Sequence, residues 1–530
     1  MPQVVRGLLD PGAHPRAVER VDLVETHISW VLLAGDRVYK IKKPVNLGFL
    51  DFTTLERRRF FCEEEVRLNR RLAPGTYLGV VELKGTGPAV RLGGPGPTLE
   101  VAVEMRRLPA DRMLDRLVLA GAIAPSLLDE LAGLLARFHA AAATGGEIDE
   151  LGGLETIRRN WMENFEQTAD LPEAVLPHPS RRSLRDWVEA FVAREAARFA
   201  ARVAAGRCRD CHGDLQAQHV CCTEPIQVFD CIEFNHRFRF GDTAGEIAFL
   251  AMDLERLGRP DLALRFLNAY VEASGDWDAV PLLDFYRAYR AFVRGKVLGF
   301  QVAAHPEHAP QARALFELAV AYTRPRRVPR LVITSGVMGS GKSTAARAVA
   351  ARLGAIVIRT DAVRKHLAGL PLQARAAEPY GGGLYAPAMG ARVYAEALRL
   401  AGEALDAGWP VVVDGSFARA AERAEARRLA TVRGLSYATL SCDAPDAVIA
   451  GRLRARERDA HEVSDGRLEL LAAHRTAFEA PAAEAGTMRI DTTGDTAAAV
   501  DRVLAELSWA ADRWHAPRTA GADTSAGGNA

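Results

Sequence analysis

The sequence lacks a large net charge of either sign. Its 530 residues include 68 Lys and Arg against 67 Asp and Glu, which leaves a formal charge of +1. Proteins that bind many nucleic-acid phosphates or an anionic membrane surface usually carry a basic excess. We therefore expect neither nucleic acid nor a membrane as a partner. The sequence indicates no particular oligomeric state.

Long apolar runs are also missing. No stretch approaches the roughly 18 residues that a membrane-spanning helix needs. The first residues, MPQVVRGLLDPGAHPRAVERVD, are broken by prolines and charges and do not form the apolar core of a secretory signal. These absences predict a cytoplasmic protein.

Cysteine is scarce, with seven residues, an odd number that argues against a disulfide framework. Five are clustered in the sequence and include a C-x-x-C pair, Cys208 and Cys211, whose spacing can hold zinc. However, Cys221, Cys222 and Cys231 lie in or beside apolar runs, where cysteine behaves as a small hydrophobe. We expect buried thiols and keep a structural zinc site as the alternative.

Lysine is the scarcest charged residue, with 7 Lys against 61 Arg. Three of the seven are Lys40, Lys42 and Lys43, and a fourth is Lys342. A compact ammonium on a flexible stem suits phosphate contact in a tight loop better than a planar guanidinium does. The few lysines are therefore candidates for phosphate binding.

Two different patterns meet at residues 323–330, TRPRRVPR, which we predict to be a linker. Residues 1–322 read as strands followed by helices, with a hairpin predicted around Gly35-Asp36. In residues 331–515, the apolar runs RLVITSG, AIVIRTD, PVVVDGS, YATLSCD and MRIDTTG alternate with helical stretches. Such runs are typical of strands buried in a parallel sheet. The small polar tail, residues 516–530, predicts disorder.

The segment GVMGSGKST, residues 336–344, contains G-x-x-x-x-G-K-S between an apolar strand and a helix. Its glycines allow backbone N–H groups to point at phosphate oxygens, and the helix adds the positive end of its dipole. Lys342 would reach the β and γ phosphates, and Ser343 would give a hydroxyl to Mg²⁺. The predicted nucleotide-binding residues are Gly336, Gly339, Ser340, Gly341, Lys342, Ser343 and Thr344.

Acidic and basic side chains follow the later strands of this half. Asp361 comes after the second apolar run, where its carboxylate can orient or deprotonate an acceptor hydroxyl while Arg364 holds an anionic acceptor. Asp414 ends the third run, a Walker-B-like place for a carboxylate linked to Mg²⁺.

An Arg-rich segment, residues 451–467, follows the fourth run and predicts a lid over the phosphates. Lid arginines neutralise charge on a phosphoryl group during its transfer. The candidates are Arg452, Arg456 and Arg458, of which we select Arg456; the alternative is a solvated basic helix.

GVMGSGKST, TDAVRKHL and VVVDGSF together resemble the P-loop small-molecule kinases of the gluconate kinase and shikimate kinase type, the related AAA-type kinases and the zeta toxins. The resemblance covers residues 331–515. It implies an α/β P-loop NTPase domain with a parallel sheet, and ATP-dependent phosphorylation of a hydroxyl with Mg²⁺.

CHGDLQAQHV, residues 211–220, followed by VFDCIEF, resembles the aminoglycoside phosphotransferase and choline kinase-like family. The family pattern is H-G-D-x-x-x-x-N, with a second Asp on a short strand. The resemblance implies an α+β bilobal, protein-kinase-like domain in which Asp214 is the catalytic base and Asp230 holds Mg²⁺. Glu233 is a further candidate acid at the metal.

The strand VYKIKKP resembles the family strand that carries the phosphate-binding lysine, and Lys40 and Lys42 share one face of it. The resemblance implies that an acid on the next helix, for which we choose Glu65, pairs with this lysine. It also implies that VEMRRL, around Glu104 and Met105, is the hinge that meets adenine.

Two features depart from the family pattern. No G-x-G-x-x-G precedes the lysine strand, and His219 stands where the family has a metal-binding Asn. An imidazole can ligate a divalent ion, but it favours softer metals than the oxygen ligands of Mg²⁺ do. The alternatives are that His219 braces the loop by hydrogen bonding, or that the site is degenerate.

The predicted function is ATP-dependent phosphorylation of a hydroxyl on a small molecule. Its chemistry is assigned to the P-loop domain, with a second kinase site in the first domain. One alternative is a pseudokinase sensor that regulates a P-loop ATPase. Another is a polynucleotide or nucleotide-sugar kinase of the zeta-toxin type. The whole chain resembles bacterial proteins that join an aminoglycoside phosphotransferase-like domain to a P-loop kinase domain.

Overall fold

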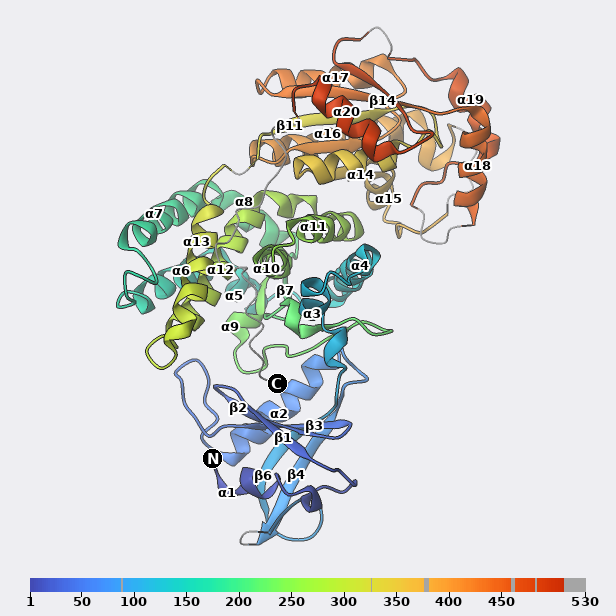
Figure 1. Cartoon of the computed structure of the whole chain (residues 1–530). Helices are drawn as coiled ribbons and strands as arrows, with labels where there is room; N and C mark the ends of the chain where they lie inside the picture. Colours follow the sequence, from blue (N-terminus) through green and yellow to red (C-terminus); the bar gives the residue numbers. More distant parts are fainter. Residues whose placement is uncertain (87–88, 326, 376–380, 459–462, 482–483, 510–530) are drawn as a thin grey trace. The chain divides into compact units, whose positions relative to one another are not determined.

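The computed structural model describes the chain except residues 87–88, 326, 376–380, 459–462, 482–483 and 510–530 (Figure 1). The predicted tail, residues 516–530, lies outside the described residues, as do the end of the predicted P-loop domain and part of the Arg-rich segment. The contacts divide the chain into two compact units. The first comprises Met1–Leu127, Arg137–Asp170 and Arg185–Leu257, and the second comprises Leu128–Ala136, Leu171–Leu184 and the chain from Gly258 onward.

A six-stranded antiparallel sheet, in the order β1-β2-β3-β6-β4-β5, begins the first unit. Its strands are β1 Val21–Glu25, β2 Ser29–Ala34, β3 Arg37–Lys42, β4 Tyr77–Thr86, β5 Ala89–Leu92 and β6 Thr98–Arg106. The predicted hairpin is confirmed, because β2 pairs with β3 across a turn in which Gly35 has a φ of 60°. That left-handed conformation is the one that glycine adopts without strain.

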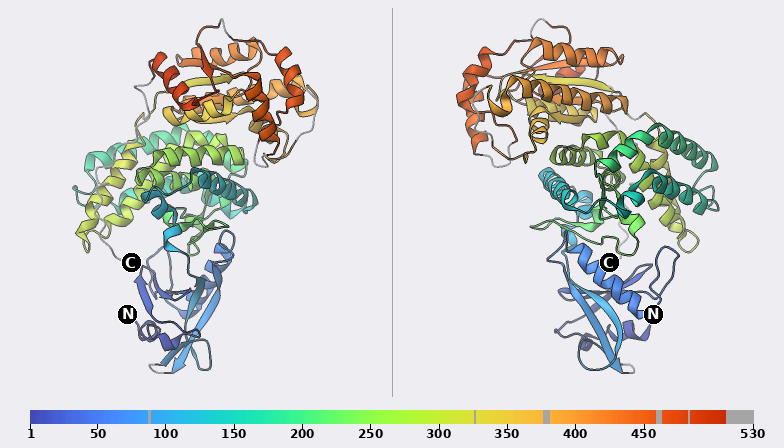
Figure 2. Two further views of the ribbon diagram at one scale, coloured as in Figure 1. Left: turned by 45° about the vertical axis from the view of Figure 1, so that its right-hand side comes forward. Right: turned by 180° about the vertical axis from the view of Figure 1, so that it is seen from behind.

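Helix α2, Leu55–Asn69, covers one face of this sheet, where Cys62 and Val66 pack against Tyr77 of β4 (Figure 2). The helix begins after Thr54, whose hydroxyl accepts the N–H of Arg57. The other face packs against the short helix α1, Gln3–Gly7. The lysine strand therefore lies in the interior of the sheet, with α2 against it.

The rest of the first unit is mostly helical and contains two small antiparallel ribbons, β7 with β10 and β8 with β9. Helices α4 and α7 contribute residues to both units. The elements here are α3 Leu114–Leu119, α4 Pro125–Ala141, α5 Glu147–Gly152, α6 Leu154–Gln167, α7 His178–Arg194, α8 Ala196–Ala204, β7 Cys208–Asp210, β8 Val220–Cys221, β9 Gln227–Val228, α9 His236–Arg239, β10 Phe240–Asp242 and α10 Thr243–Arg256.

The second unit contains a five-stranded parallel sheet in the order β12-β13-β11-β14-β15, which confirms the predicted α/β class. Its strands are β11 Arg330–Ser335, β12 Ile356–Arg359, β13 Val411–Asp414, β14 Ser436–Asp443 and β15 Thr487–Asp491. Helices α14 and α20 share one core with this sheet, and α16 and α17 pack against it as well (Figures 1 and 2).

The helices of the second unit precede, alternate with and follow these strands. They are α11 Pro260–Ser274, α12 Leu283–Gly299, α13 Ala309–Ala321, α14 Lys342–Leu353, α15 Thr360–Leu367, α16 Pro387–Asp406, α17 Ala420–Thr431, α18 Asp446–Glu457, α19 Leu471–Thr476 and α20 Thr496–Glu506. Among the residues that the structure describes, no helix combines the length and the apolar character that crossing a bilayer requires.

Candidate functional site

The first candidate site lies where β3, α2 and the segment around Asp230 meet. The Nζ atom of Lys40 is 2.6 Å from Oδ1 of Asp230 and 2.8 Å from Oε1 of Glu65. The side chain of Lys40 is 14% exposed, whereas that of Asp230 is 41% exposed, so the pair opens toward solvent on the Asp230 side. The structure thus brings three of the predicted site residues together.

Lys42, two positions along the same strand face, has a different environment. Its ammonium is 2.6 Å from Oε2 of Glu65 and also contacts Glu233, and all three side chains are buried. The carboxylate of Glu233 is therefore held by Lys42, although the sequence suggested it as a second acid at the metal. Lys42 connects β3, α2 and the Asp230 segment inside the protein, and Lys40 is the lysine beside the accessible carboxylate.

Charge pairing governs ionisation in this cluster. Burial alone would lower the pKa of Lys40, but the carboxylates of Asp230 and Glu65 outweigh it and hold that pKa well above its usual range. Desolvation would raise the pKa of Asp230, but the ammonium of Lys40 holds it well below its usual range. Both groups are consequently charged at neutral pH.

Helix α10 holds the loop that carries the predicted base, Asp214. The backbone N–H groups of His212 and Gly213 donate to the two carboxylate oxygens of Glu246, at 3.2 and 3.0 Å. The ring of His212 bonds to the carbonyl of Phe229 at 2.9 Å, which ties this loop to the strand before Asp230. Asp214 itself accepts from the side chain of Gln216 at 2.6 Å, and its side chain is 30% exposed.

His219 lies between the predicted base, Asp214, and the predicted metal ligand, Asp230. Its Nδ1 is 2.9 Å from the backbone carbonyl oxygen of Asp214 and 3.4 Å from Oδ2 of the same residue. Its Nε2 is 3.6 Å from Oδ2 of Asp230 and 3.1 Å from the side-chain nitrogen of Gln218. The loop thus brings Asp214, His219 and Asp230 together.

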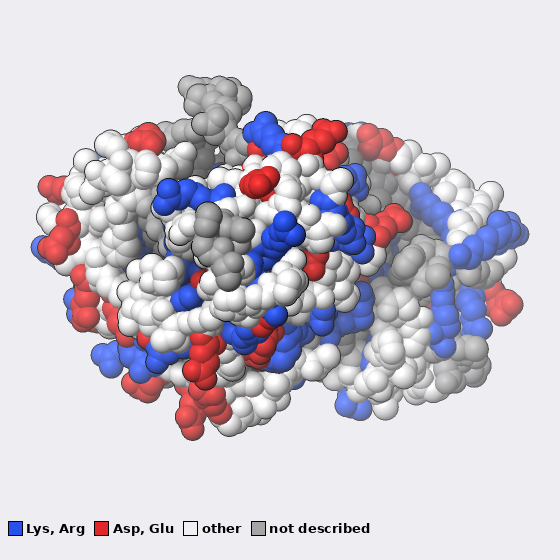
Figure 3. Space-filling view, turned by 90° about the horizontal axis from the view of Figure 1, so that it is seen from below, with Lys and Arg blue, Asp and Glu red and all other residues white. Residues whose placement is uncertain are grey.

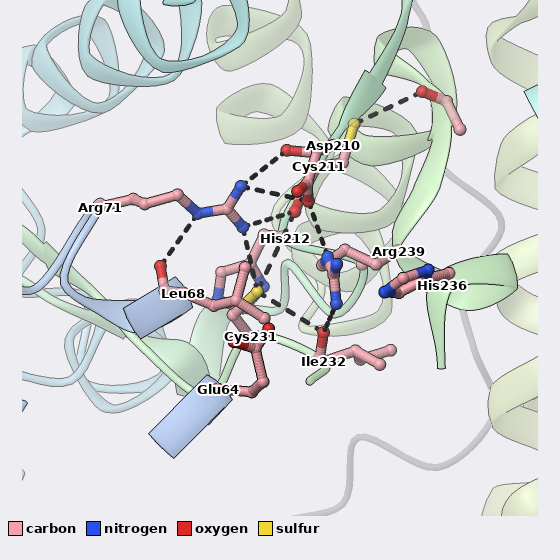
Figure 4. A network of polar contacts seen from close by, with 12 residues as sticks. Glu64, Leu68, Arg71, Asp210, Cys211, His212, Cys231, Ile232, His236 and Arg239 are labelled. Carbon is pink, nitrogen blue, oxygen red and sulfur yellow. Dashed lines mark hydrogen bonds and ion pairs between the residues drawn. The ribbon is translucent and has the colours of Figure 1, made fainter. Parts of the chain in front are cut away.

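A network of polar contacts around Arg71, just beyond the end of α2, fixes the segments before Asp214 and around Asp230 (Figure 4). Its guanidinium donates to the backbone carbonyls of Asp210 and Cys211, both at 2.9 Å, and to the sulfur of Cys231 at 3.3 Å. Arg239 adds bonds to the carboxylate of Asp210 and to the carbonyl of Ile232. The side chain of Arg71 therefore holds both the segment that leads to Asp214 and the segment next to Asp230.

Helix α2 and strand β4 make further contacts to the same segment through side chains that the sequence did not single out. Asn69 accepts the N–H of Cys231 at 2.9 Å, and the hydroxyl of Tyr77 accepts the N–H of Asp230 at 3.1 Å. Asp230 adopts a φ of 65°, which is uncommon for a residue other than glycine. A periodic sequence pattern cannot predict such contacts, because about 150 residues separate the two partners.

The predicted adenine hinge lies at the end of β6. Val103 pairs with Lys40 and Met105 pairs with Val38, so the side chain of Met105 lies on the sheet face of Lys40. Glu104 lies on the opposite face, where its carboxylate is 3.4 Å from the Arg37 guanidinium. A contact from Glu104 to adenine would therefore involve its backbone.

The second candidate site is the loop between β11 and α14. Gly336, Gly339 and Gly341 have φ values of 149°, 77° and 85°. A Cβ on Gly341 would lie 2.7 Å from Thr492, and one on Gly336 would lie 2.5 Å from the carbonyl of Cys442. The loop therefore needs glycine for both its conformation and its packing, and the helix that follows presents unpaired N–H groups at its start.

A cavity of about 820 Å³ opens on this loop and brings together most of the predicted P-loop residues. Its lining includes Gly339, Gly341, Lys342, Ser343, Asp361, Arg364, Asp414 and Arg456. Three predicted nucleotide-binding residues, Gly336, Ser340 and Thr344, do not line it; Ser340 is buried and Thr344 faces outward. The ammonium of Lys342 donates to the carbonyl of Val337 at 2.8 Å, and burial lowers its pKa.

The acidic side of this cavity is organised by Asp414. Its Oδ1 accepts from the hydroxyl of Thr334 at 3.1 Å, and its Oδ2 lies 3.6 Å from Nε of Arg359. Arg359 also donates to Glu272 of α11 at 2.8 Å, a contact within the second unit that the sequence did not suggest. Ser343 and Asp414 offer the oxygen donors that Mg²⁺ prefers, so these residues fit that ion.

The three candidate arginines of the Arg-rich segment have different positions. Arg452 is tied to Thr492 at 2.9 Å and to the P-loop carbonyl of Gly339 at 3.4 Å, so it braces the loop from outside. Arg458 is exposed, and Arg456 lines the cavity. His474, which the sequence did not indicate, accepts the backbone N–H of Met338 at 3.2 Å.

The cavity lining near Arg364 carries aromatic and charged groups. The Arg364 guanidinium lies 4.6 Å from the ring centre of Tyr385, and the hydroxyl of Tyr385 donates to Asp465 at 2.9 Å. Tyr394 and Arg419 also line the cavity. Together these groups can bind a polar acceptor.

All seven cysteines are buried thiols. Burial raises the pKa of Cys211 and of Cys231, the latter to about 12. Across the described ranges, no group of three or more His, Cys, Asp or Glu side chains is arranged to hold a metal ion. This burial is consistent with the prediction that the cysteines are buried thiols.

Comparison with known proteins gives matches in both halves. Residues 62–283 match the phosphotransferase enzyme family, and residues 331–481 match an AAA domain. Uncharacterized proteins of Mycobacterium tuberculosis and Mycobacterium bovis are 38% identical over 487 residues, which is 91% of this chain and 94% of each relative.

Solved structures resemble the halves separately. A gluconokinase from Sinorhizobium meliloti is 26% identical over 34% of this chain and 94% of its own, with a TM-score of 0.25. A choline/ethanolamine kinase family protein from Mesorhizobium loti is 14% identical over 61% of this chain and 99% of its own, with a TM-score of 0.35. An aminoglycoside 2'-phosphotransferase is 13% identical over 61% and 100%, with a TM-score of 0.39.

The two family matches confirm both resemblances that the motifs suggested. The mycobacterial relatives extend over nearly the whole chain, across both halves. The chain therefore belongs to the family of these mycobacterial proteins, in which a phosphotransferase-family domain is joined to an AAA-family P-loop domain.

Proposed function

We propose that the protein is an ATP-dependent phosphotransferase that phosphorylates a hydroxyl of a small molecule. The main support for this function is the cavity of about 820 Å³ at the P-loop. Its lining includes Lys342, Ser343, Asp361 and Asp414. Pockets of this size bind ligands as large as nucleotides. The match of residues 62–283 to the phosphotransferase enzyme family supports the same reaction class.

In the P-loop domain, the backbone N–H groups of the loop and the ammonium of Lys342 bind the phosphates. The lowered pKa of Lys342 reflects its burial, and a polyphosphate would supply the negative charge that this ammonium lacks. Asp361 orients the acceptor hydroxyl and accepts its proton. Arg364 binds an anionic group of the acceptor, and Arg456 compensates charge on the phosphoryl group.

Magnesium would be held here by Ser343 and Asp414, and it would neutralise phosphate charge during transfer. The chain's own contribution is to fix these oxygens: Thr334 donates to one oxygen of Asp414, and Arg359 lies beside the other. This arrangement orients the carboxylate at the cavity that it lines.

We propose a second phosphotransfer site in the first domain. Lys40 would bind nucleotide phosphates, Glu65 would position Lys40, and Asp214 would accept the proton of a separate acceptor hydroxyl. The shared contacts of Lys40 with Glu65 and Asp230 support this assignment. In the competing pseudokinase hypothesis, the same residues bind nucleotide without transfer.

A small-molecule acceptor is favoured over a polynucleotide by the charge balance of the chain, 68 Lys and Arg against 67 Asp and Glu. On the face drawn in Figure 3, acidic side chains lie among the basic ones. A polynucleotide kinase would need a basic excess to follow the phosphate backbone.

The test is ATP consumption by the full chain against a panel of sugars, polyols, nucleosides and RNA ends. Lys342→Ala should abolish transfer by the P-loop domain, and Asp214→Asn should abolish transfer by the first domain. Lys84→Ala, a lysine of β4 paired with Glu82, serves as the matched control and should behave as wild type. Full turnover in Lys342→Ala would refute the P-loop assignment.

A further inference from the structure

Two electron-rich atoms, Nε2 of His219 and Oδ2 of Asp230, lie next to each other. The Nδ1 atom of the ring is 2.9 Å from the carbonyl oxygen of Asp214. A carbonyl oxygen can only accept, so Nδ1 carries the proton in this contact. In the neutral ring, Nε2 then presents a lone pair, and this atom faces Oδ2 of Asp230 across 3.6 Å.

The neighbouring contacts agree with this tautomer. The side-chain nitrogen of Gln218 lies 3.1 Å from Nε2, where an amide N–H can donate to the lone pair. Lys40 engages Oδ1 of Asp230, which leaves Oδ2 for another partner. A nitrogen lone pair and a carboxylate oxygen at this separation are stabilised by a cation between them.

An imidazole in this position reproduces both functions of a carboxamide. An Asn offers one donor nitrogen and one acceptor oxygen, which here would serve the Asp214 carbonyl and a metal. His219 offers Nδ1–H to the carbonyl and the Nε2 lone pair toward Asp230. The replacement therefore keeps the hydrogen bond that shapes the loop and substitutes a nitrogen ligand for an oxygen ligand.

We propose that His219 Nε2 and Asp230 Oδ2 form a divalent-cation site that favours transition metals over Mg²⁺, with Mn²⁺ as the spectroscopic probe. This inference rests on the proposed phosphotransfer site of the first domain and names the cation of that site. Mg²⁺ strongly prefers oxygen ligands, whereas imidazole suits transition metals. The site would have two protein ligands, with nucleotide phosphates and water completing the coordination.

The geometry requires only a small adjustment to admit the ion. Ligand atoms at neighbouring positions around a cation with bonds of about 2.1 Å lie roughly 3 Å apart. The observed separation is 3.6 Å, and the Asp230 side chain is 41% exposed, which gives an ion access from solvent. Gln218 would give up its contact to Nε2, a cost of one hydrogen bond.

The experiment uses the full chain with Mn²⁺ and a non-hydrolysable ATP analogue, and it reads nitrogen-14 coupling to the Mn²⁺ electron spin by pulsed EPR. The proposed P-loop ligands, Ser343 and Asp414, are oxygen donors, so an imidazole nitrogen signal reports on the first domain. We expect this signal in wild type and its loss in His219→Asn. The preference for Mn²⁺ over Mg²⁺ should fall about 10-fold in that variant.

Gln218→Ala is the matched control, because it removes the neighbour of Nε2 and leaves the ligand; it should keep the nitrogen signal. A signal that persists in His219→Asn, or is absent from folded wild type, overturns the inference. Because the readout needs no turnover, the metal site and the reaction can fail separately. Nitrogen coupling without phosphate transfer refutes only the proposed reaction, and Mg²⁺-dependent transfer by the first domain without nitrogen coupling refutes only the metal site.

Discussion

The ammonium of Lys40 lies 2.6 Å from Oδ1 of Asp230, although 190 positions separate the two residues in the chain. Lys42, on the same face of β3, is instead buried against Glu65 and Glu233. We propose that the two lysines have different tasks. Lys40 would bind a nucleotide, whereas Lys42 holds the sheet, helix α2 and the Asp230 segment together.

This division predicts different losses in Lys40→Met and Lys42→Met. Lys40→Met should keep the fold and lose nucleotide affinity in the first domain. Lys42→Met should destabilise that domain by about 3–5 kcal/mol, because it leaves the buried carboxylate of Glu233 without its cation, whereas Glu65 keeps Lys40. Chemical denaturation and nucleotide titration measure the two effects. Equal stability of Lys42→Met and wild type would refute the structural role.

The loop before Asp214 predicts a specific sensitivity to a methyl group. Gly213 has a φ of 86°, and a Cβ there would lie 2.9 Å from the carbonyl of Phe238. Gly258 has a similar φ of 78° but has no atom within 4 Å of such a Cβ, so it is the matched control. Gly258→Ala should cost about 1 kcal/mol through backbone strain alone, and Gly213→Ala should cost more and abolish transfer by the first domain. Denaturation midpoints that coincide for the two variants would contradict the predicted clash.

The contact of Glu272 with Arg359 predicts a change in metal dependence at the P-loop. In Glu272→Gln, Arg359 loses its carboxylate partner and should pair more closely with Asp414, where it competes with the cation. The Mg²⁺ concentration for half-maximal activity should rise several-fold with a smaller change in kcat. Asp278→Asn, which loses only an exposed pair with Arg399, is the control. An unaltered Mg²⁺ dependence in Glu272→Gln would exclude the positioning role.

The imidazole of His474 predicts a pH dependence of stability. Burial, followed by the charge of Lys342, lowers its pKa from 6.5 to about 4. The unfolded chain thus binds more protons between these values, and stability falls as pH drops from 6.5 toward 4. The loss should reach about 2 kcal/mol at pH 5. His474→Gln, which keeps an acceptor for Met338, should show a smaller loss between pH 7 and pH 5 in thermal unfolding; an unchanged slope would contradict this assignment.

Much of the fold follows from local pattern. The five apolar runs predicted the parallel strands, and the glycine spacing predicted a P-loop between β11 and α14, because both signals are contained within short stretches. Sequence alone could not separate Lys40 from Lys42, since both lie on one strand face. Their roles depend on Glu233 and Asp230, about 190 residues away, and on which ammonium is shielded from water.

The same limit applies to residues that act through distant partners. Arg71, Asn69 and Glu272 are ordinary polar positions on helices or at helix ends, and nothing in their spacing indicates what they contact. Each acquires its role from a carbonyl, an N–H or a side chain brought near by the tertiary fold. His219 is the intermediate case, because its departure from the family motif was visible, but its tautomer follows only from the carbonyl of Asp214.

We propose that one chain contains two nucleotide sites. The most direct measurement is the binding stoichiometry of a non-hydrolysable ATP analogue, determined by calorimetry with Mg²⁺ and Mn²⁺ present. We predict two molecules per chain in wild type, one in Lys342→Ala, one in Lys40→Met and none in the double variant. One molecule per wild-type chain that disappears in Lys342→Ala would contradict the claim and leave the P-loop as the single nucleotide site.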